Sequence, residues 1–487
     1  MANVTFPFPF PQHLELILPE IFLAIMAMVL LIWDLFVSKD HKKWIAYAAM
    51  LSCVATALLV LKVTTGEVGT TFYGYFVMDP FAAFAKLLIL AAAVFGAILS
   101  LDFMEKEANV GEYYCLMLFA VLGMMLMVSS NNFMTMYLGL ELMALSVYVL
   151  VGYQRDLLRS SEAALKYFIL GSLSSGMLLY GITFLYGVTA SFNFVTIGHA
   201  LVDANNSAHG VVMLGLVFVL AGLVFKVSVA PFHMWTPDTY EGAPTPVTAF
   251  MSVAPKVAGF VILMRILHDV FPAIQADYTS ILVVLAAVTI VVGNVAAIAQ
   301  RNVKRMMAYS TIGHVGFVLL GLIAANAEGY TGALVYLTVY LFMNMGVFAI
   351  VILMRRDGIQ GELLDDFSGL SKVRPGYALA MGLLLFSLAG IPFLGGFWAK
   401  YAVILPVLGA GHLYLALLAI VFSVIGSFYY LRLIKYMYFD DVRVTFNFIE
   451  NPAMQATVIV SAFAVVAIGL YPAPVMSICK QALVGLI

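Results

Sequence analysis

The stretch FKVSVAPFHMWTPD (residues 225–238) breaks an apolar segment that otherwise runs over residues 209–240. It places Lys226, Pro231 and Pro237 inside a segment longer than the roughly 20 residues that one straight membrane helix needs. Proline removes a backbone donor and clashes with the preceding helical turn. Backbone polar groups freed at membrane depth are tolerated only where protein or water satisfies them. The stretch therefore predicts an interrupted membrane helix.

A second stretch of this kind, SLAGIPFLGGFWAK (residues 387–400), interrupts the apolar segment 377–408 with one proline and three glycines. Each interruption has a lysine beside it, Lys226 before the first and Lys400 after the second. Paired interrupted helices in two opposed halves are typical of inverted-repeat transporters whose site lies near the bilayer midplane. Ordinary proline kinks in long helices are the alternative interpretation.

The composition excludes most other classes of protein. Hydrophobic residues make up 63% of the 487 residues and charged residues 10%, against roughly 45–50% and about 25% in globular proteins. A net charge of −2 gives no basic surface for nucleic acid. The three cysteines, Cys53, Cys115 and Cys479, stand too far apart for a CxxC zinc, iron–sulfur or redox motif. No glycine-rich nucleotide motif is present.

Apolar segments predict an all-α polytopic membrane protein with about 14 transmembrane helices. The connections are short, so residues 1–487 form one membrane domain without a separate soluble part. The predicted spans are 15–37, 44–63, 80–103, 112–129, 132–153, 160–189, 209–240, 244–270, 278–299, 303–325, 329–354, 377–408, 411–438 and 453–473.

Basic residues indicate how the chain crosses the membrane, because loops rich in lysine and arginine stay in the cytoplasm. Sixteen of the 24 fall in alternate connections on one side, while Lys62, Arg265 and Lys480 lie at the margins of the other. This predicts that both termini are periplasmic in the inner membrane of a bacterium. The sixteen are Lys39, Lys42, Lys43, Lys106, Arg155, Arg159, Arg301, Lys304, Arg305, Arg355, Arg356, Lys372, Arg374, Arg432, Lys435 and Arg443.

Ionisable groups deep inside the predicted spans are the main functional candidates, since each costs about 2.5–3.5 kcal/mol at a helix centre. Glu141 is the one acid so deep, and Lys226, Lys256 and Lys400 lie well inside spans. Burial disfavours the charged form of a lysine and a nearby carboxylate favours it. We therefore expect a Glu141–Lys226 pair to load and release protons. Lys166, one to two turns inside its helix, is a further candidate.

Other ionisable residues have plainer interpretations. Lys86 lies near the outer end of its span and is expected to snorkel to the surface. Glu20, at the end of the first span, is expected at the interface. His314, in the tenth span, is a candidate proton relay, as is His233 in the first interruption. A packing role is the equal alternative for both histidines. No histidine pair or His/Asp cluster suggests a metal site.

Three stretches resemble the antiporter-like membrane subunits of respiratory complex I, the NADH:quinone oxidoreductase. The similarity covers essentially the whole chain, and its most specific element is P-F-H-x-W-x-P-D-x-Y-x-G-A-P. The stretches are FKVSVAPFHMWTPDTYEGAPTPVTAFMSVAPKVAGF (225–260), QRNVKRMMAYSTIGHVGF (300–317) and SLAGIPFLGGFWAKYAVI (387–404).

This resemblance implies two inverted five-helix repeats, at 112–270 and 278–438, each with a discontinuous helix. By match to the family's motifs it implies a proton channel that uses Glu141, Lys226, Lys256 and Lys400, with Lys166 matching a further family lysine. Two features favour one subunit type of this family over two sister subunit types. The first is the lysine at position 400, where one sister type has a glutamate in its twelfth helix. The second is that the chain ends shortly after the fourteenth span, whereas the other sister type has a long C-terminal extension.

The resemblance also implies what this chain works with. It places FMN, iron–sulfur clusters and quinone in partner subunits, with no cofactor in this chain. The implied partners are the neighbouring antiporter-like and small membrane subunits, the peripheral redox arm and the lipid bilayer, with no nucleic acid. Two alternatives are a subunit of a multisubunit cation/proton antiporter, which works without redox partners, and a membrane scaffold whose lysines are merely ion-paired.

Overall fold

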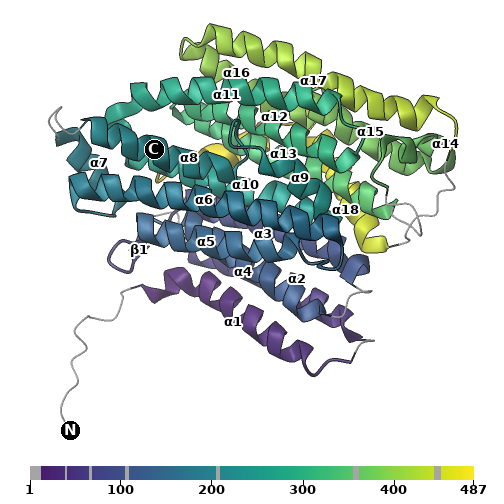
Figure 1. The fold of residues 1–487 in the computed structure, drawn as a ribbon, viewed down its shortest axis with the longest axis horizontal. Helices are drawn as coiled ribbons and strands as arrows, with labels where there is room; N and C mark the ends of the chain where they lie inside the picture. Colours follow the sequence, from purple (N-terminus) through teal and green to yellow (C-terminus); the bar gives the residue numbers. More distant parts are fainter. Residues whose placement is uncertain are drawn as a thin grey trace.

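The computed structural model describes residues 13–38, 41–64, 68–104, 109–203, 209–354, 361–443 and 451–486. Among these residues, thirteen helices are long and apolar enough to cross a membrane, and they pack side by side along one direction (Figure 1). Twelve are uninterrupted: α1 (Leu18–Asp34), α2 (Lys43–Val63), α3 (Pro80–Met104), α4 (Val110–Val128), α5 (Phe133–Val151), α6 (Leu158–Thr189), α10 (Thr245–Asp269), α11 (Gln275–Ile298), α12 (Val303–Ile323), α13 (Ala327–Leu353), α17 (Leu413–Phe439) and α18 (Pro452–Leu470).

The two predicted interruptions are present, and the thirteen candidate spans become the 14 predicted when α15 and α16 are counted as one interrupted span. The first separates α8 (His209–Lys226) from α9 (Trp235–Gly242). The second separates two short apolar helices, α15 (Pro375–Ala389) and α16 (Gly395–Gly409). Pro237 does not break a helix, because it lies in the first turn of α9, where no intrahelical partner awaits its missing N–H.

Two of the longer connections between the predicted spans contain structure. Residues 63–79 hold a hairpin of β1 (Gly69–Thr71) and β2 (Phe76–Met78), and residues 190–208 hold α7 (Phe194–Asp203). Phe194, Ile197 and Leu201 are buried along one face of α7, a helical spacing that the sequence already contained. The remaining short elements are η1 (Leu14–Ile17), η4 (Pro272–Ile274), η5 (Leu364–Phe367), α14 (Leu370–Val373) and α19 (Ala473–Ala482).

Ion pairs gather many of the basic residues at one end of the bundle. Arg159 and Lys304 both contact Glu362, and Arg443 contacts Asp365. The segment around α14 lies at this end, while α7 and β1 lie at the opposite end (Figure 1). Of the basic residues used to predict the topology, four lie outside the described residues, namely Lys39, Lys106, Arg355 and Arg356.

Three helices form the centre of the bundle and carry much of the candidate site. The apolar window of α10 is buried along its whole length, and those of α12 and α13 are nearly so. Tight packing supports this arrangement: a side chain at Gly293 of α11 would collide with the backbone of Gly313 in α12. Because Lys256 lies on α10 and His314 on α12, these two residues are held inside rigid, closely packed helices.

Candidate functional site

Three of the predicted lysines are buried and have no carboxylate beside them. Lys226, Lys256 and Lys400 are 3%, 1% and 8% exposed. Among the described residues, none of their ammonium groups has a carboxylate oxygen within 4.0 Å. Burying an unpaired charge is expensive in a membrane. Among the described residues, the hydrogen-bond and ring partners of these lysines are therefore neutral dipoles and aromatic rings.

Lys256 is held against the first interruption. Its ammonium donates to the backbone carbonyl of Lys226, the last residue of α8, at 3.3 Å and to Ser228 Oγ at 2.6 Å. It also lies 4.7 Å from the centre of the Trp235 ring. Because a helix C-terminus carries partial negative charge and an aromatic face attracts cations, both contacts favour the ammonium form.

Lys400 repeats this arrangement at the second interruption. Its ammonium donates to the carbonyl of Ala389, the last residue of α15, at 2.8 Å and to Ser423 Oγ at 2.8 Å. The next residue, Gly390, has a φ of +89°, and a Cβ there would come 2.9 Å from the Lys400 side chain. The left-handed helix cap therefore favours glycine at this position, and a Cβ there would also displace the Lys400 side chain.

Lys226 lies at the junction of the first interruption but faces away from Lys256. Its ammonium donates to Ser175 Oγ of α6 at 3.2 Å and, more weakly, to the Tyr148 hydroxyl of α5 at 3.4 Å. The side chain of Lys226 and the carbonyl of Lys226 thus belong to two neighbouring sites. The interruption therefore connects two buried ammonium groups through a single residue.

Glu141 does not form the expected direct pair with Lys226. No ion pair joins the two side chains, and one carboxylate oxygen of Glu141 is buried without a hydrogen-bond partner in the described part of the chain. The contact between α5 and Lys226 is made instead by Tyr148, two turns further along the helix. Residues seven apart lie on the same face of a helix, so Glu141 and Tyr148 differ in their position along α5 and not in the face that they occupy.

His314 is buried beside Lys400. Its Nδ1 lies 2.6 Å from the Tyr336 hydroxyl and its Nε2 lies 2.9 Å from the Tyr430 hydroxyl. A small cavity lined by His314, Tyr430 and Lys400 has about 10 Å³ available to the centre of a water molecule, close to the minimum that one water requires. The other candidate histidine, His233, is half-buried in the first interruption.

Lys166 belongs to a different environment from the three buried lysines. Its side chain is 45% exposed and forms ion pairs with Glu162 at 2.8 Å and Asp238 at 2.9 Å. The structure does not bring it into contact with the other candidates. Lys166 lies near the start of α6, where a helix end meets the α9 segment rather than the bundle centre.

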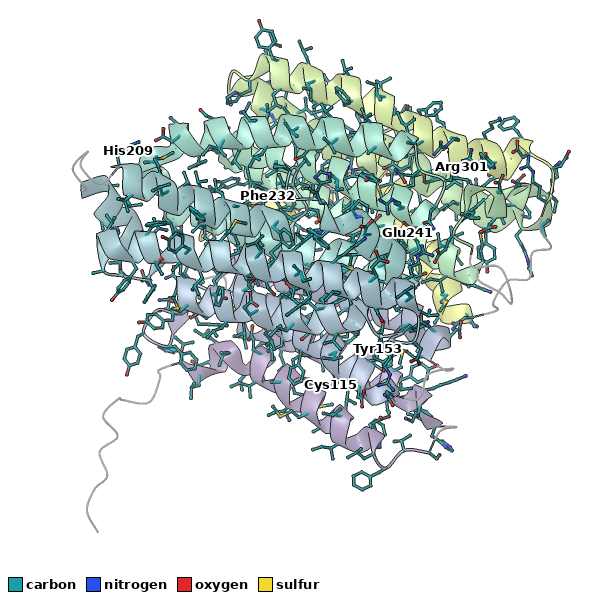
Figure 2. The ribbon with its side chains drawn as sticks, viewed as in Figure 1. Cys115, Tyr153, His209, Phe232, Glu241 and Arg301 are labelled. Carbon is teal, nitrogen blue, oxygen red and sulfur yellow. The ribbon has the colours of Figure 1, made fainter. Side chains whose placement is uncertain are left out.

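Asp238 and its neighbours form a larger ionic network, which the sequence did not indicate. Arg305 contacts Asp238 at 2.7 Å and Glu241 at 2.9 Å. Figure 2 shows Glu241 nearer than Phe232 to the end of the bundle that carries Arg301. A cavity of about 220 Å³ lies beside this network. The further members are Arg159, Lys304 and Glu362, joined by contacts of 2.9 to 3.3 Å.

Two buried ion pairs near the opposite end were also missed. Lys86 does not snorkel: it is fully buried and lies 2.6 Å from Glu20, which is itself buried rather than interfacial. Arg265 contacts Asp79 at 2.7 Å, with both side chains buried. The first pair joins α1 to α3, and the second joins the residue that precedes α3 to α10. Ion-pair partners that are brought together by tertiary packing leave no signal in the local sequence.

No metal-binding group is apparent in the described ranges, where no three histidine, cysteine or acidic side chains cluster. The three cysteines are free and buried. The chemistry that this set of residues offers is proton exchange, because amines, imidazole and hydroxyls each bind and release protons.

Comparisons with known proteins identify relatives over nearly the whole chain. Residues 130–426 match the family model described as NADH:quinone oxidoreductase/Mrp antiporter, TM. The chain is 45% identical over 473 residues to a Paramagnetospirillum magneticum protein named NADH-quinone oxidoreductase subunit N, covering 96% of each sequence.

Solved structures show the same fold. A chain of respiratory complex I from Thermus thermophilus superposes with a TM-score of 0.80 at 30% identity, covering 94% of this chain and 98% of that one. A chain of an Mrp complex from a Dietzia species reaches a TM-score of 0.82 over 97% and 98% of the two chains. At 20% identity, this second likeness concerns the fold alone.

Proposed function

Since this chain belongs to the NADH:quinone oxidoreductase/Mrp antiporter membrane family, we propose that it is the antiporter-like subunit N of an NADH–quinone oxidoreductase and translocates protons. One observation carries the proposal. At each interruption, a lysine ammonium that has no carboxylate partner among the described residues lies between a helix C-terminus and a serine hydroxyl. A purely structural lysine would be expected to have an acidic partner, as Lys86 has in Glu20.

This arrangement suits a site that changes charge. A lysine held only by neutral dipoles exists either as an ammonium, which donates to the carbonyl and the hydroxyl, or as a neutral amine. Burial narrows the free-energy difference between these two forms. A modest change in the electrostatic potential, caused by a neighbouring group, is then enough for the lysine to bind or release the proton. Lys226, Lys256 and Lys400 are the sites that we assign to this exchange.

The route that we propose runs across two inverted repeats, residues 112–270 and 278–438. Protons enter from the cytoplasm to Lys226, pass Lys256 and His314, and leave near Lys400. Glu141 modulates the first step through its field rather than through a contact, because no ion pair joins it to Lys226. Lys166 and the ionic network hold the cytoplasmic end of α9, and so position the interruption.

The energy for this transport comes from outside the chain. We propose that electrons pass through FMN, iron–sulfur clusters and quinone in partner subunits, and that this chain holds no redox centre of its own. It contributes to the enzyme as a translocating subunit. Its partners are the neighbouring antiporter-like and small membrane subunits and, through them, the peripheral arm.

The orientation in a bacterial inner membrane follows from the basic residues, with both termini periplasmic. Asp365 offers a direct test, because it lies at the basic end and is 59% exposed. A cysteine introduced as Asp365→Cys should react with an impermeant maleimide in inside-out vesicles and not in intact cells whose periplasm is open to the reagent. Labelling from the periplasm alone would reverse the topology.

The identity of the complex is tested by isolating it through an affinity tag on this chain. We expect NADH:quinone reductase activity and flavin and iron–sulfur spectra to co-purify with the chain. The alternative, a cation/proton antiporter, predicts a complex without flavin that exchanges Na⁺ or K⁺ for protons in vesicles when no NADH is supplied. That result would overturn the proposal.

A further inference from the structure

Each interruption presents the same set of cation-binding groups to a buried ammonium. A carbonyl at a helix C-terminus and a serine hydroxyl lie 3.3 and 2.6 Å from Lys256 Nζ, and 2.8 and 2.8 Å from Lys400 Nζ. The centre of an aromatic ring lies 4.7 Å from the first ammonium and 5.1 Å from the second. All three groups direct partial negative charge toward the ammonium, so each site favours a cation.

The two lysines reach these sites by different routes. Lys256 comes from α10, the helix that follows the interrupted span, whereas Lys400 comes from α16, the second half of its own span. The feature common to both halves is therefore a cation at the helix C-terminus. The lysine side chain is the tether that holds the cation there.

The carbonyl at each helix end depends on the lysine, while its neighbours do not. The carbonyl of Phe225 accepts from a backbone and an indole N–H, and that of Phe386 accepts from backbone N–H groups. Within the described ranges, the carbonyls of Lys226 and Ala389 accept from the lysine ammonium only. In transporters with interrupted helices, backbone carbonyls at such helix ends coordinate the transported cation.

We propose that each interruption is a binding site for a monovalent cation of the size of ammonium or potassium, which Lys256 and Lys400 occupy as tethered cations. A tethered ammonium cannot be washed out by metal ions, and unlike a metal ion it can release a proton. The two lysines would thus select protons over alkali cations at these sites. This selectivity deepens the proposed proton transport and rests on it.

Lys226 provides a comparison within the same chain. Its ammonium contacts the hydroxyls of Ser175 and Tyr148, and no backbone carbonyl among the residues that the structure describes. Hydroxyls both donate and accept, so they can satisfy each other or a water once the lysine is removed, whereas a carbonyl only accepts. Removing Lys226 should therefore leave no cation site.

The first experiment measures cation binding to the purified, intact complex. Radioactive Rb⁺, an analogue of K⁺, is bound by equilibrium dialysis at constant ionic strength, with choline as the replacing cation. We expect Lys256→Ala and Lys400→Ala each to bind Rb⁺ that the wild type does not bind, saturating at a single additional ion per complex. Lys226→Ala should match the wild type.

A further control and a check on assembly complete this experiment. Lys400→Met fills the vacated space with an apolar side chain and should bind no additional Rb⁺. Flavin content and native gels establish that each variant is assembled. Because the two sites lie at different interruptions, either alanine variant that assembles tests the proposal.

The second experiment measures proton pumping by Lys400→Ala in liposomes with added cations. Propylammonium has the same three carbons and nitrogen that this substitution removes, so it can place an ammonium on the vacated carbonyl and hydroxyl. We expect propylammonium to raise pumping several-fold over the untreated variant. Tetramethylammonium has no N–H to donate and K⁺ has no proton to release, so neither should raise pumping.

The outcomes separate the cation sites from the function. If Lys256→Ala and Lys400→Ala bind no more Rb⁺ than the wild type, the proposed sites are overturned, whatever the pumping rate. Additional Rb⁺ in Lys226→Ala would overturn the role assigned to the helix ends. Additional Rb⁺ in Lys400→Ala together with restoration of pumping by K⁺ would support the site but overturn the proposed proton exchange, because a cation without a proton would then suffice.

Discussion

The Lys400 ammonium and the backbone carbonyl of Ala389 are 2.8 Å apart, so a buried lysine caps the helix that ends at the second interruption. Lys256 and the carbonyl of Lys226 stand in the same relationship at the first interruption, at 3.3 Å. The lysines come from different positions in the chain, since Lys256 lies on the next helix and Lys400 on the second half of its own. The two halves therefore share the arrangement of a lysine ammonium at a helix C-terminus, and not the position of that lysine along the chain.

Lys226 should not tolerate arginine. The ammonium contacts a serine and a tyrosine hydroxyl without a carboxylate, and guanidinium stays protonated in proteins. We therefore expect Lys226→Arg to lower the proton-pumping rate by roughly tenfold or more, as loss of a positioned acid–base group does. Pumping is measured in reconstituted liposomes relative to the amount of assembled complex.

The exposed Lys372, which is paired with Asp441, provides the control for this substitution. Lys372→Arg should leave both pumping and assembly unchanged. Full pumping in Lys226→Arg would mean that Lys226 only needs to be a fixed positive charge.

Glu141 should matter for pumping but not for assembly. It forms no ion pair with the described residues, so among them Glu141→Gln removes a charge without leaving a cation unpaired. We expect normal amounts of complex, judged by native gels and flavin content, with pumping reduced several-fold. An equal loss of assembled complex and of pumping would assign Glu141 a structural role.

Glu362 should stabilise the ionic network in a pH-dependent manner. Burial alone would raise the pKa of this carboxyl, but Lys304 and Arg159 outweigh it and hold its pKa below the ordinary value of 4.5. A lowered folded-state pKa means that the stabilisation is present above the ordinary pKa and is lost as the pH falls through the lowered one.

Glu362→Gln should therefore destabilise the complex near neutral pH by about 1.5–3 kcal/mol, the range for hydrogen bonds to charged groups. Thermal inactivation of the purified complex, followed from neutral pH to well below pH 4.5, measures this. The variant and the wild type should converge at the acidic end. The control is Glu328→Gln, at an exposed residue without an ion pair among the described residues, and its thermal stability should match the wild type at every pH. A difference between Glu362→Gln and the wild type that stays constant with pH would contradict the electrostatic explanation.

Local patterns in the sequence were sufficient to predict the spans, both interruptions and the lysines beside them. Apolar length and helix-breaking residues act within one segment, and a membrane leaves few alternatives to a helix. The same patterns cannot determine which faces of distant helices meet. The local sequence around Lys86 therefore gives no sign of its partner Glu20, and nothing local distinguishes Lys166, which lies in a partly exposed network, from the buried lysines.

The surroundings of His314 illustrate the same limit. Tyr336 and Tyr430 are 22 and 116 residues away along the chain, and 25 tyrosines offer no reason to select these two. The helix α7 is a different case, because its apolar spacing was present in the sequence and was hidden by its position between two long spans. Most of the features that could not be predicted from the sequence are tertiary contacts, which local helix propensity does not determine.

The most direct test of the central claim is the number of protons pumped per electron in Lys400→Ala, measured together with quinone reduction in liposomes. The matched control is the double variant Lys86→Met/Glu20→Gln, which removes a buried ion pair of the same bundle without leaving an unpaired charge. We expect the control to retain the wild-type ratio. If carboxylate-free lysines at the interruptions carry the protons, Lys400→Ala should lose pumping and slow quinone reduction with it, whereas a wild-type proton-to-electron ratio in Lys400→Ala would contradict the account.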